Sequence, residues 1–324
     1  MIISIDKNAF FSDDNETLKS LTKIVELGID ENYLWDISNF DDFYEDMLET
    51  KWFRDFLSTN TQNEFIETLN KISQKDAYIT ELHSYYLNKI KIGFSENEIN
   101  PIYAYRILKE RSKLVLENST NDWKFIKGIT HKYTKKGDRR NLFKILDKAI
   151  ENKLVEPENA GGKDGIKPRI TDLLDRHSQF IALKTGTVFD SDKKNEKDEL
   201  SQTHRNLIEF LEKKSITWHK LEKREIENYL TPEIIEYYFP EQQLVCDELK
   251  QKSAEELDYL EYDKIFTDID VKNEFPKLFL KEELKRGDLE KRCEHKKFQI
   301  HLPNGTLTDV SELEYLLIKL VKIF

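Results

Sequence analysis

The sequence contains few cysteines, glycines and prolines, and each shortage argues against a class of protein. Two cysteines occur among the 324 residues, far apart and outside any Cys-x-x-Cys pair, so neither a zinc cluster nor a disulfide scaffold is expected. Ten glycines and seven prolines are too few for a turn-rich all-β chain. The first residues lack the features of a secretory signal, and no run of about 18 apolar residues is present. We therefore expect no membrane span and a cytoplasmic location.

The chain has no excess of positive charge, although charged residues of both signs are abundant. They make up 35% of the chain, and the excess of acidic residues gives a net charge of −11. A chain of this charge does not attract nucleic acid over its whole surface, so binding DNA or RNA would require a local basic patch, a bound cation or both. Hydrophobic residues, at 38%, are sufficient for two or three packed units.

The periodicity of apolar residues predicts three regions. Residues 1–105 are mainly helical, with a possible strand at residues 2–5. Residues 106–235 alternate strand and helix candidates, which predicts an α/β fold with a mainly parallel sheet and helices on both faces. Residues 236–324 are again expected to be largely helical, and the Lys/Glu-rich run 281–297 is expected to be one solvated helix, with a basic interaction arm as the alternative. The expected central strands cover residues 114–117, 180–189 and 216–221, and the expected central helices cover residues 139–153, 168–177 and 199–214.

Two aspartates follow the longest of these strands. Asp190 and Asp192 are separated by one residue, so period-two geometry would direct both side chains to the same face. Two carboxylates this close repel each other unless a cation or a proton lies between them, and Mg²⁺ prefers such oxygen ligands. The alternative is a polar turn without a ligand. Asp268 and Asp270 have the same spacing without a long apolar strand before them, and we interpret that pair as a helix start or a turn.

A glutamate follows another predicted strand. Glu117 comes after the apolar residues 114–116 and precedes a polar turn and an amphipathic helix. Because sites in open α/β sheets lie outside the carboxyl ends of the strands, Glu117 and the two aspartates are expected to meet at one edge. A glycine loop, residues 160–165, lies between them in the sequence. Alone, Glu117 would be a surface or helix-start acid, but the joint pattern predicts a divalent-metal site.

The order of these motifs resembles a Toprim domain. Leu-Val-Leu-Glu117, then Gly161-Gly162, then Val-Phe-Asp190-Ser-Asp192 are similar to the motifs of that domain, which occurs in type IA and II topoisomerases, bacterial primases and OLD-type nucleases. The segment Arg-Glu-Ile-Glu-Asn-Tyr-Leu at residues 224–230 is similar to one in the DUF4435 and OLD-like Toprim nucleases, including the effector nuclease of PARIS-type anti-phage systems. The resemblance covers residues 106–235 and implies a Rossmann-like sheet.

The chain departs from this family directly after the motif glutamate. The family usually has a glycine next and an acid four residues after the glutamate. This chain has Asn118 there, and its acid, Asp122, lies five residues on. The turn and the spacing of Asp122 therefore differ from the family pattern, while the three core carboxylates remain in order.

The resemblance implies a metal-dependent nuclease. Asp190 and Asp192 would bind Mg²⁺ or Mn²⁺, and Glu117 would be a further ligand or the base that activates water. A second metal could use Glu117 with Glu225 or Glu227. We expect these two glutamates to share one strand face, and we favour Glu227 because it follows the family pattern best; the alternative is that both are helix-cap or solvent acids. The expected activity is hydrolysis of phosphodiester bonds in DNA or RNA, with tRNA as one possible target. The alternative is a catalytically silent Toprim scaffold or regulatory binding module.

Basic residues that could hold the substrate are concentrated after the first motif. The densest stretch contains Lys135, Lys136, Arg139 and Arg140, and Lys163 lies in the glycine loop. These five residues are candidates for binding nucleic-acid phosphates. The alternative is a helix surface and its linker.

Further partners are implied by the resemblance alone. Related nucleases are commonly paired with an ATPase of the ABC or SMC-like type. No Walker A motif, G-x-x-x-x-G-K-[ST], occurs in this chain, so ATP sensing would require a separate subunit. The helical regions 1–105 and 236–324 would then dock that partner or form a homodimer.

Overall fold

Two sheets with parallel strand pairing organise the chain. The structure is a computed structural model that describes residues 1–38, 40, 42–74, 79–177 and 179–324. These residues divide into two units, one of residues 1–112 with 322–324 and the other of residues 113–321. Each sheet belongs to one unit, and the α/β class predicted from the sequence is confirmed. Within the described residues, no helix combines the length and apolar character that a membrane crossing requires.

The first unit contains a three-stranded parallel sheet in the order β2-β1-β3. The predicted strand at residues 2–5 is confirmed as β1, and it lies between two strands that periodicity did not predict. Asp14 starts the long helix α2 by accepting a hydrogen bond from the Thr17 amide at 2.9 Å. The strands are β1 (Ile2–Ile5), β2 (Leu34–Asp36) and β3 (Lys89–Ile92), and the helices are α1 (Lys7–Phe10), α2 (Asn15–Ile29), α3 (Tyr44–Leu48), η1 (Trp52–Phe56), α4 (Thr59–Gln74), α5 (Glu81–Tyr86) and α6 (Pro101–Leu108).

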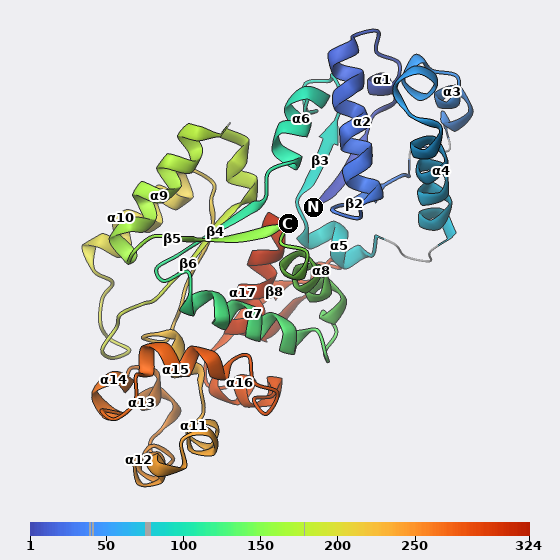
Figure 1. Ribbon diagram of the computed structural model, residues 1–324. Helices are drawn as coiled ribbons and strands as arrows, with labels where there is room; N and C mark the ends of the chain where they lie inside the picture. Colours follow the sequence, from blue (N-terminus) through green and yellow to red (C-terminus); the bar gives the residue numbers. More distant parts are fainter. Residues whose placement is uncertain (39, 41, 75–78, 178) are drawn as a thin grey trace. The chain divides into compact units, whose positions relative to one another are not determined.

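The second unit contains a four-stranded sheet in the order β5-β4-β6-β7. Strand β6 pairs in parallel with β4 on one side and with β7 on the other. Helices α9 and α10 lie to one side of the sheet, and α7, α8 and α17 lie to the other (Figure 1). The strands are β4 (Ser112–Leu116), β5 (Val155–Asn159), β6 (Thr185–Phe189) and β7 (Thr217–Lys220), and the helices around them are α7 (Asn121–Tyr133), α8 (Arg140–Glu151), α9 (Lys163–Arg176), η2 (Gln179–Lys184), α10 (Gln202–Lys213) and α17 (Glu312–Leu320).

Apolar side chains from the sheet and two helices form a core on the α9–α10 side. Val115 and Phe189 face this core from β4 and β6, and Ile166, Ile170 and Leu211 meet them from the helices. Each of these five side chains is at most 1% exposed. Their burial fixes the register of the strands, because a shift of one residue would turn Val115 and Phe189 to the opposite face. This register also fixes the ends of β4 and β6, which are followed by the predicted acids Glu117 and Asp190.

The rest of the second unit consists of short helices and one hairpin. Helix α15 packs against α7 and the 3₁₀ turn η3, and α17 packs against β7. Asp270 caps α15 through the Asn273 amide, which confirms that the second Asp-x-Asp pair marks a helix start. The elements are η3 (Ile226–Tyr229), α11 (Pro232–Tyr238), η4 (Pro240–Gln242), α12 (Gln243–Leu249), α13 (Ala254–Asp258), α14 (Tyr262–Ile265), α15 (Val271–Leu278), α16 (Arg286–Arg292), β8 (Lys297–His301) and β9 (Leu307–Ser311), and η5 (Val321–Ile323) follows α17 at the end of the chain.

Two elements predicted from the sequence differ from those in the structure. The strand expected at residues 180–189 begins only at Thr185, because η2 precedes it and the Thr185 hydroxyl bonds back to Ile181 O at 2.8 Å. The run 281–297 is not one helix. The Asp288 side chain accepts a hydrogen bond from the Lys285 amide at 2.7 Å, which starts α16 late, and the chain enters the β8–β9 hairpin at Lys297.

A close backbone approach between α7 and the end of α15 can be tested with alanine. A Cβ on Gly128 would lie 2.3 Å from Phe279 O, whereas one on Gly287 in α16 would meet nothing within 4 Å. We expect Gly128→Ala to lower the free energy of unfolding by about 1–3 kcal/mol through overpacking. Gly287→Ala should be neutral or stabilising by up to about 1 kcal/mol, because alanine favours a helix. Equal effects of the two substitutions in chemical denaturation would contradict this packing.

Candidate active site

A cavity of about 440 Å³ lies beyond the carboxyl ends of β4 and β6. Four acidic side chains and one lysine line it, and they come from separate segments of the second unit. The full lining is Glu117, Asn118, Asn121, Asp122, Asn159, Gly161, Gly162, Asp190, Ile226, Glu227 and Lys272. The predicted meeting of Glu117 with Asp190 at one edge of the sheet is therefore found.

Strand pairing brings the first two acids together. Glu117 follows the last residue of β4, Asp190 follows the last residue of β6, and the pairing of Leu116 with Val188 aligns the two strand ends. The Asp190 amide donates a hydrogen bond to Glu117 Oε1 at 3.1 Å. Asp122, in the first turn of α7, accepts a hydrogen bond from the Asn118 amide at 2.9 Å. The acid that departs from the family spacing therefore still reaches the cavity.

The glycine loop forms one wall of the cavity. Gly161 and Gly162 have φ angles of 71° and 111°, in the region that favours glycine. A Cβ on either residue would meet nothing within 4 Å, so the backbone conformation and not crowding requires glycine. The Gly162 amide donates to Glu117 O at 3.0 Å, which ties the loop to the end of β4.

The fourth acid, Glu227, comes from η3 and is 3% exposed. The expectation that Glu225 and Glu227 share one strand face is wrong, because residues 226–229 form a 3₁₀ turn. Glu227 lines the cavity, whereas Glu225 accepts a hydrogen bond from Lys272 Nζ at 2.8 Å. Lys272 lies in α15, outside any motif, and no sequence pattern marks it.

Burial raises the pKa of every acid in the cavity. Burial, opposed by the Asp190 N–H and reinforced by the charges of Asp192 and Asp122, raises the pKa of Glu117 to about 7. Burial raises the pKa of Asp122 to about 6 and that of Glu227 to about 7. Burial and the charge of Glu117 raise the pKa of Asp190 well above its usual range. The site therefore disfavours its own negative charge when no cation is bound.

Lys272 supplies positive charge to this cluster. Burial alone would lower its pKa, but the carboxylates of Glu227 and Glu225 outweigh burial and raise it. Its side chain remains half exposed. One ammonium group thus faces four cavity carboxylates and Glu225, which leaves an excess of acid.

Asp192 lies outside the cavity, contrary to the prediction that it shares a face with Asp190. Its φ of 54° is left-handed, which interrupts the period-two alternation of the strand. The Asp192 carboxylate forms an ion pair with Lys163 Nζ and lines a separate cavity of about 200 Å³. Its amide donates to Arg224 O at 3.2 Å.

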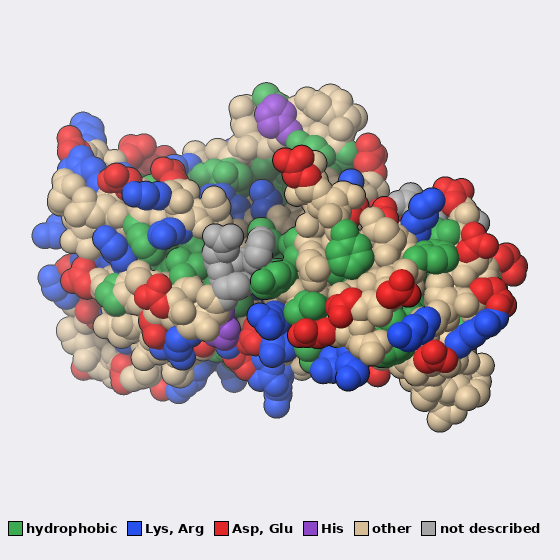
Figure 2. All heavy atoms as spheres, turned by 90° about the horizontal axis from the view of Figure 1, so that it is seen from above, with side chains coloured by type: hydrophobic (Ala, Val, Ile, Leu, Met, Phe, Trp, Pro, Cys, Tyr) green, Lys and Arg blue, Asp and Glu red, His purple; other side chains and the backbone are tan. Residues whose placement is uncertain are grey.

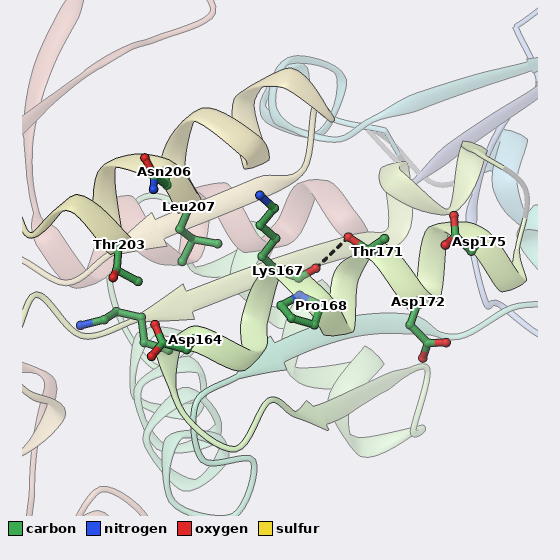
Figure 3. A pocket seen from close by; sticks show the side chains of 10 residues that line it. Asp164, Lys167, Pro168, Thr171, Asp172, Asp175, Thr203, Asn206 and Leu207 are labelled. Atoms are coloured by element: carbon green, nitrogen blue, oxygen red, sulfur yellow. Dashed lines mark hydrogen bonds between the residues drawn. The ribbon is translucent and has the colours of Figure 1, made fainter.

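A larger cavity, of about 640 Å³, lies between α9 and α10. Figure 3 shows Lys167, Pro168 and Thr171 on one helix facing Leu207 and Asn206 on the other. None of the four acids of the carboxylate cavity lines it. Its lining is Lys163, Asp164, Lys167, Pro168, Thr171, Asp172, Asp175, Thr203, Asn206 and Leu207.

The predicted basic stretch is not beside the carboxylate cavity. Lys135 and Lys136 are exposed just past the C-terminal end of α7, whereas the cavity lies at its N-terminal end. Thirteen helical residues separate the two ends by about 20 Å. Arg140 is exposed, but Arg139 Nε is 2.8 Å from Glu314 Oε1, in an ion pair that is mostly buried. Of the five predicted phosphate-binding residues, Lys163 is the one that borders the Asp190–Asp192 turn.

Basic and acidic side chains are interspersed on the face drawn in Figure 2. That mixture agrees with the net charge of −11. A polyanion would therefore depend on local positive charge, such as Lys163 and Lys272, together with a bound cation.

The donor set suits a hard divalent cation. Glu117, Asp122, Asp190 and Glu227 offer only carboxylate oxygens, which Mg²⁺ and Mn²⁺ accept. Burial raises their pKa values, and a cation between them would offset the cost of burying their negative charge. In the described part of the chain, no three His, Cys, Asp or Glu side chains already converge in a metal-ligand arrangement.

Comparisons of the chain with family models, with curated proteins and with solved structures found no match.

The pKa of Glu227 predicts a pH-dependent stability. Between pH 4.5 and about 7, the folded metal-free protein holds a proton on Glu227 that the unfolded chain releases, so stability falls as pH rises through this window. Glu227→Gln should therefore raise the free energy of unfolding at pH 8 by about 1–2 kcal/mol and leave it unchanged near pH 4. Urea denaturation at the two pH values measures this. A variant less stable than the parent at pH 8 would refute the assignment.

The two neighbouring arginines should respond differently to charge reversal. Arg139→Glu breaks the pair with Glu314, so we expect a loss of about 3 kcal/mol or more of stability. Arg140→Glu, at an exposed position, should change stability by about 0.5 kcal/mol or less. Thermal denaturation compares the two variants, and a loss for Arg139→Glu of about 0.5 kcal/mol or less would show that the pair with Glu314 has no structural role.

Proposed function

We propose that residues 113–321 form a Mg²⁺- or Mn²⁺-dependent nuclease that hydrolyses phosphodiester bonds of DNA or RNA. The observation that carries the proposal is that Glu117, Asp122, Asp190 and Glu227 line one cavity at the carboxyl edge of the sheet. The resemblance of residues 106–235 to a Toprim domain supports the same assignment.

Three of the four acids, and Lys272, have roles that follow from their surroundings. Asp190, Glu117 and Glu227 would hold the cation, which would lower the pKa of a water molecule and offset charge on the phosphodiester. Glu117 Oε1 accepts a hydrogen bond from the Asp190 amide, which leaves Oε2 available to accept a proton. The Lys272 ammonium would contact a phosphate oxygen and reduce its repulsion by the acids.

Asp192 would join the site only if its ion pair with Lys163 opened. The Asp192 side chain is 48% exposed and that of Lys163 is 18% exposed. A solvent-accessible ion pair contributes about 0–1 kcal/mol, so a divalent cation could displace Lys163. The released Lys163 would then be free to bind a substrate phosphate.

The alternative is a catalytically silent Toprim scaffold or regulatory module. The ion pair of Asp192 with Lys163 favours it, because one acid of the family motif is already neutralised by the chain itself. A Mn²⁺ titration separates the two functions. A nuclease should bind Mn²⁺ at this cavity, and a scaffold should not.

The resemblance also supports a cellular role. We propose a toxic effector of a prokaryotic anti-phage system, located in the cytoplasm, acting with a separate ABC or SMC-like ATPase subunit. The unit of residues 1–112, with its own sheet, would provide a surface for that partner or for a second copy of the chain.

The test is metal-dependent cleavage of DNA and RNA substrates. Asp190→Asn and Glu227→Gln should each lower the Mg²⁺-dependent cleavage rate by about 100-fold or more, because both remove an oxygen charge from the cavity. Lys272→Ala should lower it by about 10-fold or more. Asp268→Asn, in the exposed Asp-x-Asp pair, is the matched control and should leave the rate unchanged. Full activity of Asp190→Asn would refute the proposed function.

A further inference from the structure

The segment that carries Glu227 is held by more than its own hydrogen bonds. Residues 222–230 follow β7 and contain only the single turn η3, and a turn this short is unstable alone. On one side, the segment supports the Asp190–Asp192 turn. Ser191 Oγ donates to Lys223 O at 2.8 Å, and the Asp192 amide donates to Arg224 O at 3.2 Å.

On the other side of this segment lies a buried ionic cluster centred on Asp258, at the end of α13. The Asp258 carboxylate forms an ion pair with Lys223 Nζ and lies 2.8 Å from Arg292 Nη2. His295 Nε2 is 2.7 Å from its second oxygen. Lys223, Asp258 and Arg292 are 2%, 4% and 4% exposed. We call these four residues the Asp258 cluster.

Backbone groups extend the Asp258 cluster directly to η3. The Arg224 amide donates to Asp258 O at 2.8 Å, and Arg292 Nη2 donates to Asn228 O at 2.8 Å. Asn228 Nδ2 donates to Leu257 O at 2.8 Å, and its Oδ1 accepts from the Glu225 amide at 3.0 Å. Residues on both sides of Glu227 are therefore anchored to α13 and α16.

Such a cluster specifies position more than it adds stability. Burying charges costs several kcal/mol each, so a buried ion pair contributes little compared with a packed apolar core. Removing one partner has a large effect, because the remaining charges lose their compensation. Without Asp258, Lys223 and Arg292 would be two buried cations with no carboxylate between them.

We infer that Asp258 and Arg292 are positioning residues that hold Glu227 in the carboxylate cavity and support the Asp190–Asp192 turn. The inference rests on the proposed function for its catalytic consequence. Neither residue lines the cavity, so both act through residues 222–230. Residues beyond the Toprim-like stretch would thus determine whether the metal ligands are correctly placed.

The experiment compares Asp258→Asn with Glu314→Gln. Glu314 belongs to another mostly buried ionic cluster of the same unit, with Arg139 and Arg286, and it lies outside the carboxylate cavity. Three experiments are done on the full-length protein. They measure backbone hydrogen exchange of residues 222–230, Mn²⁺ affinity, and the cleavage kinetics (kcat and KM).

Asp258→Asn should speed exchange in residues 222–230 by about 10-fold or more. It should weaken Mn²⁺ binding by a similar factor, and it should lower kcat with KM changed by about threefold or less. Glu314→Gln should lower the melting temperature but change none of these quantities. Arg292→Lys should retain more Mn²⁺ affinity than Arg292→Met, and this pair decides the matter if Asp258→Asn fails to fold.

Equal effects of Asp258→Asn and Glu314→Gln on exchange and on Mn²⁺ affinity would overturn the inference. If the parent protein neither binds Mn²⁺ nor cleaves nucleic acid, the proposed function fails separately. Exchange in residues 222–230 then still decides whether Asp258 holds this segment, and unchanged exchange would refute it.

Discussion

Burial of several carboxylates in one cavity is the constraint on which the candidate site depends. Glu117, Asp190 and Glu227 come from two strand ends and a 3₁₀ turn, and they line one cavity. Burial raises the pKa of each, so their shared negative charge is costly. An arrangement that costs stability in the free protein is characteristic of a functional site, where a ligand relieves the strain. A divalent cation is the ligand that oxygen donors of this kind favour.

The Asp258 cluster has the opposite charge balance. There, one carboxylate faces Lys223, Arg292 and His295, whereas in the cavity one lysine faces several carboxylates. Both clusters include a residue of the segment 222–230, Lys223 in one and Glu227 in the other. Compensated charge fixes this segment, and the segment in turn presents Glu227 where charge is uncompensated. The helices after residue 235 therefore belong to the same unit as the sheet, because they anchor the segment that carries Glu227.

The sequence predicts best those features that local pattern controls. The strand–turn–helix that begins at Leu114 and the meeting of Glu117 with Asp190 follow from apolar runs that end in acids, and parallel pairing aligns those ends. The same pattern predicts the position of Asp192 wrongly. A single left-handed residue changes the side-chain direction, and no local sequence pattern indicates it. The role of Arg139 depends on Glu314, which lies 175 residues away.

The residues that the sequence did not reveal reach the site through tertiary packing. Lys272 enters the cavity because α15 packs against α7 and η3, and nothing in its neighbours marks it as special. Asp258 lies in an ordinary acidic stretch, and only burial beside two cations distinguishes it. Long-range contacts of this kind leave no periodic signal in one sequence. They become visible when the helices that carry them are placed in space.

The most direct measurement is a crystal structure of the protein soaked in Mn²⁺, with the metal located by anomalous scattering. The account predicts a peak between the carboxylates of Glu117, Asp190 and Glu227, and the loss of that peak in crystals of Asp190→Asn. A peak elsewhere, or no peak in crystals of the parent protein at millimolar Mn²⁺, would contradict the assignment of this cavity as a metal centre.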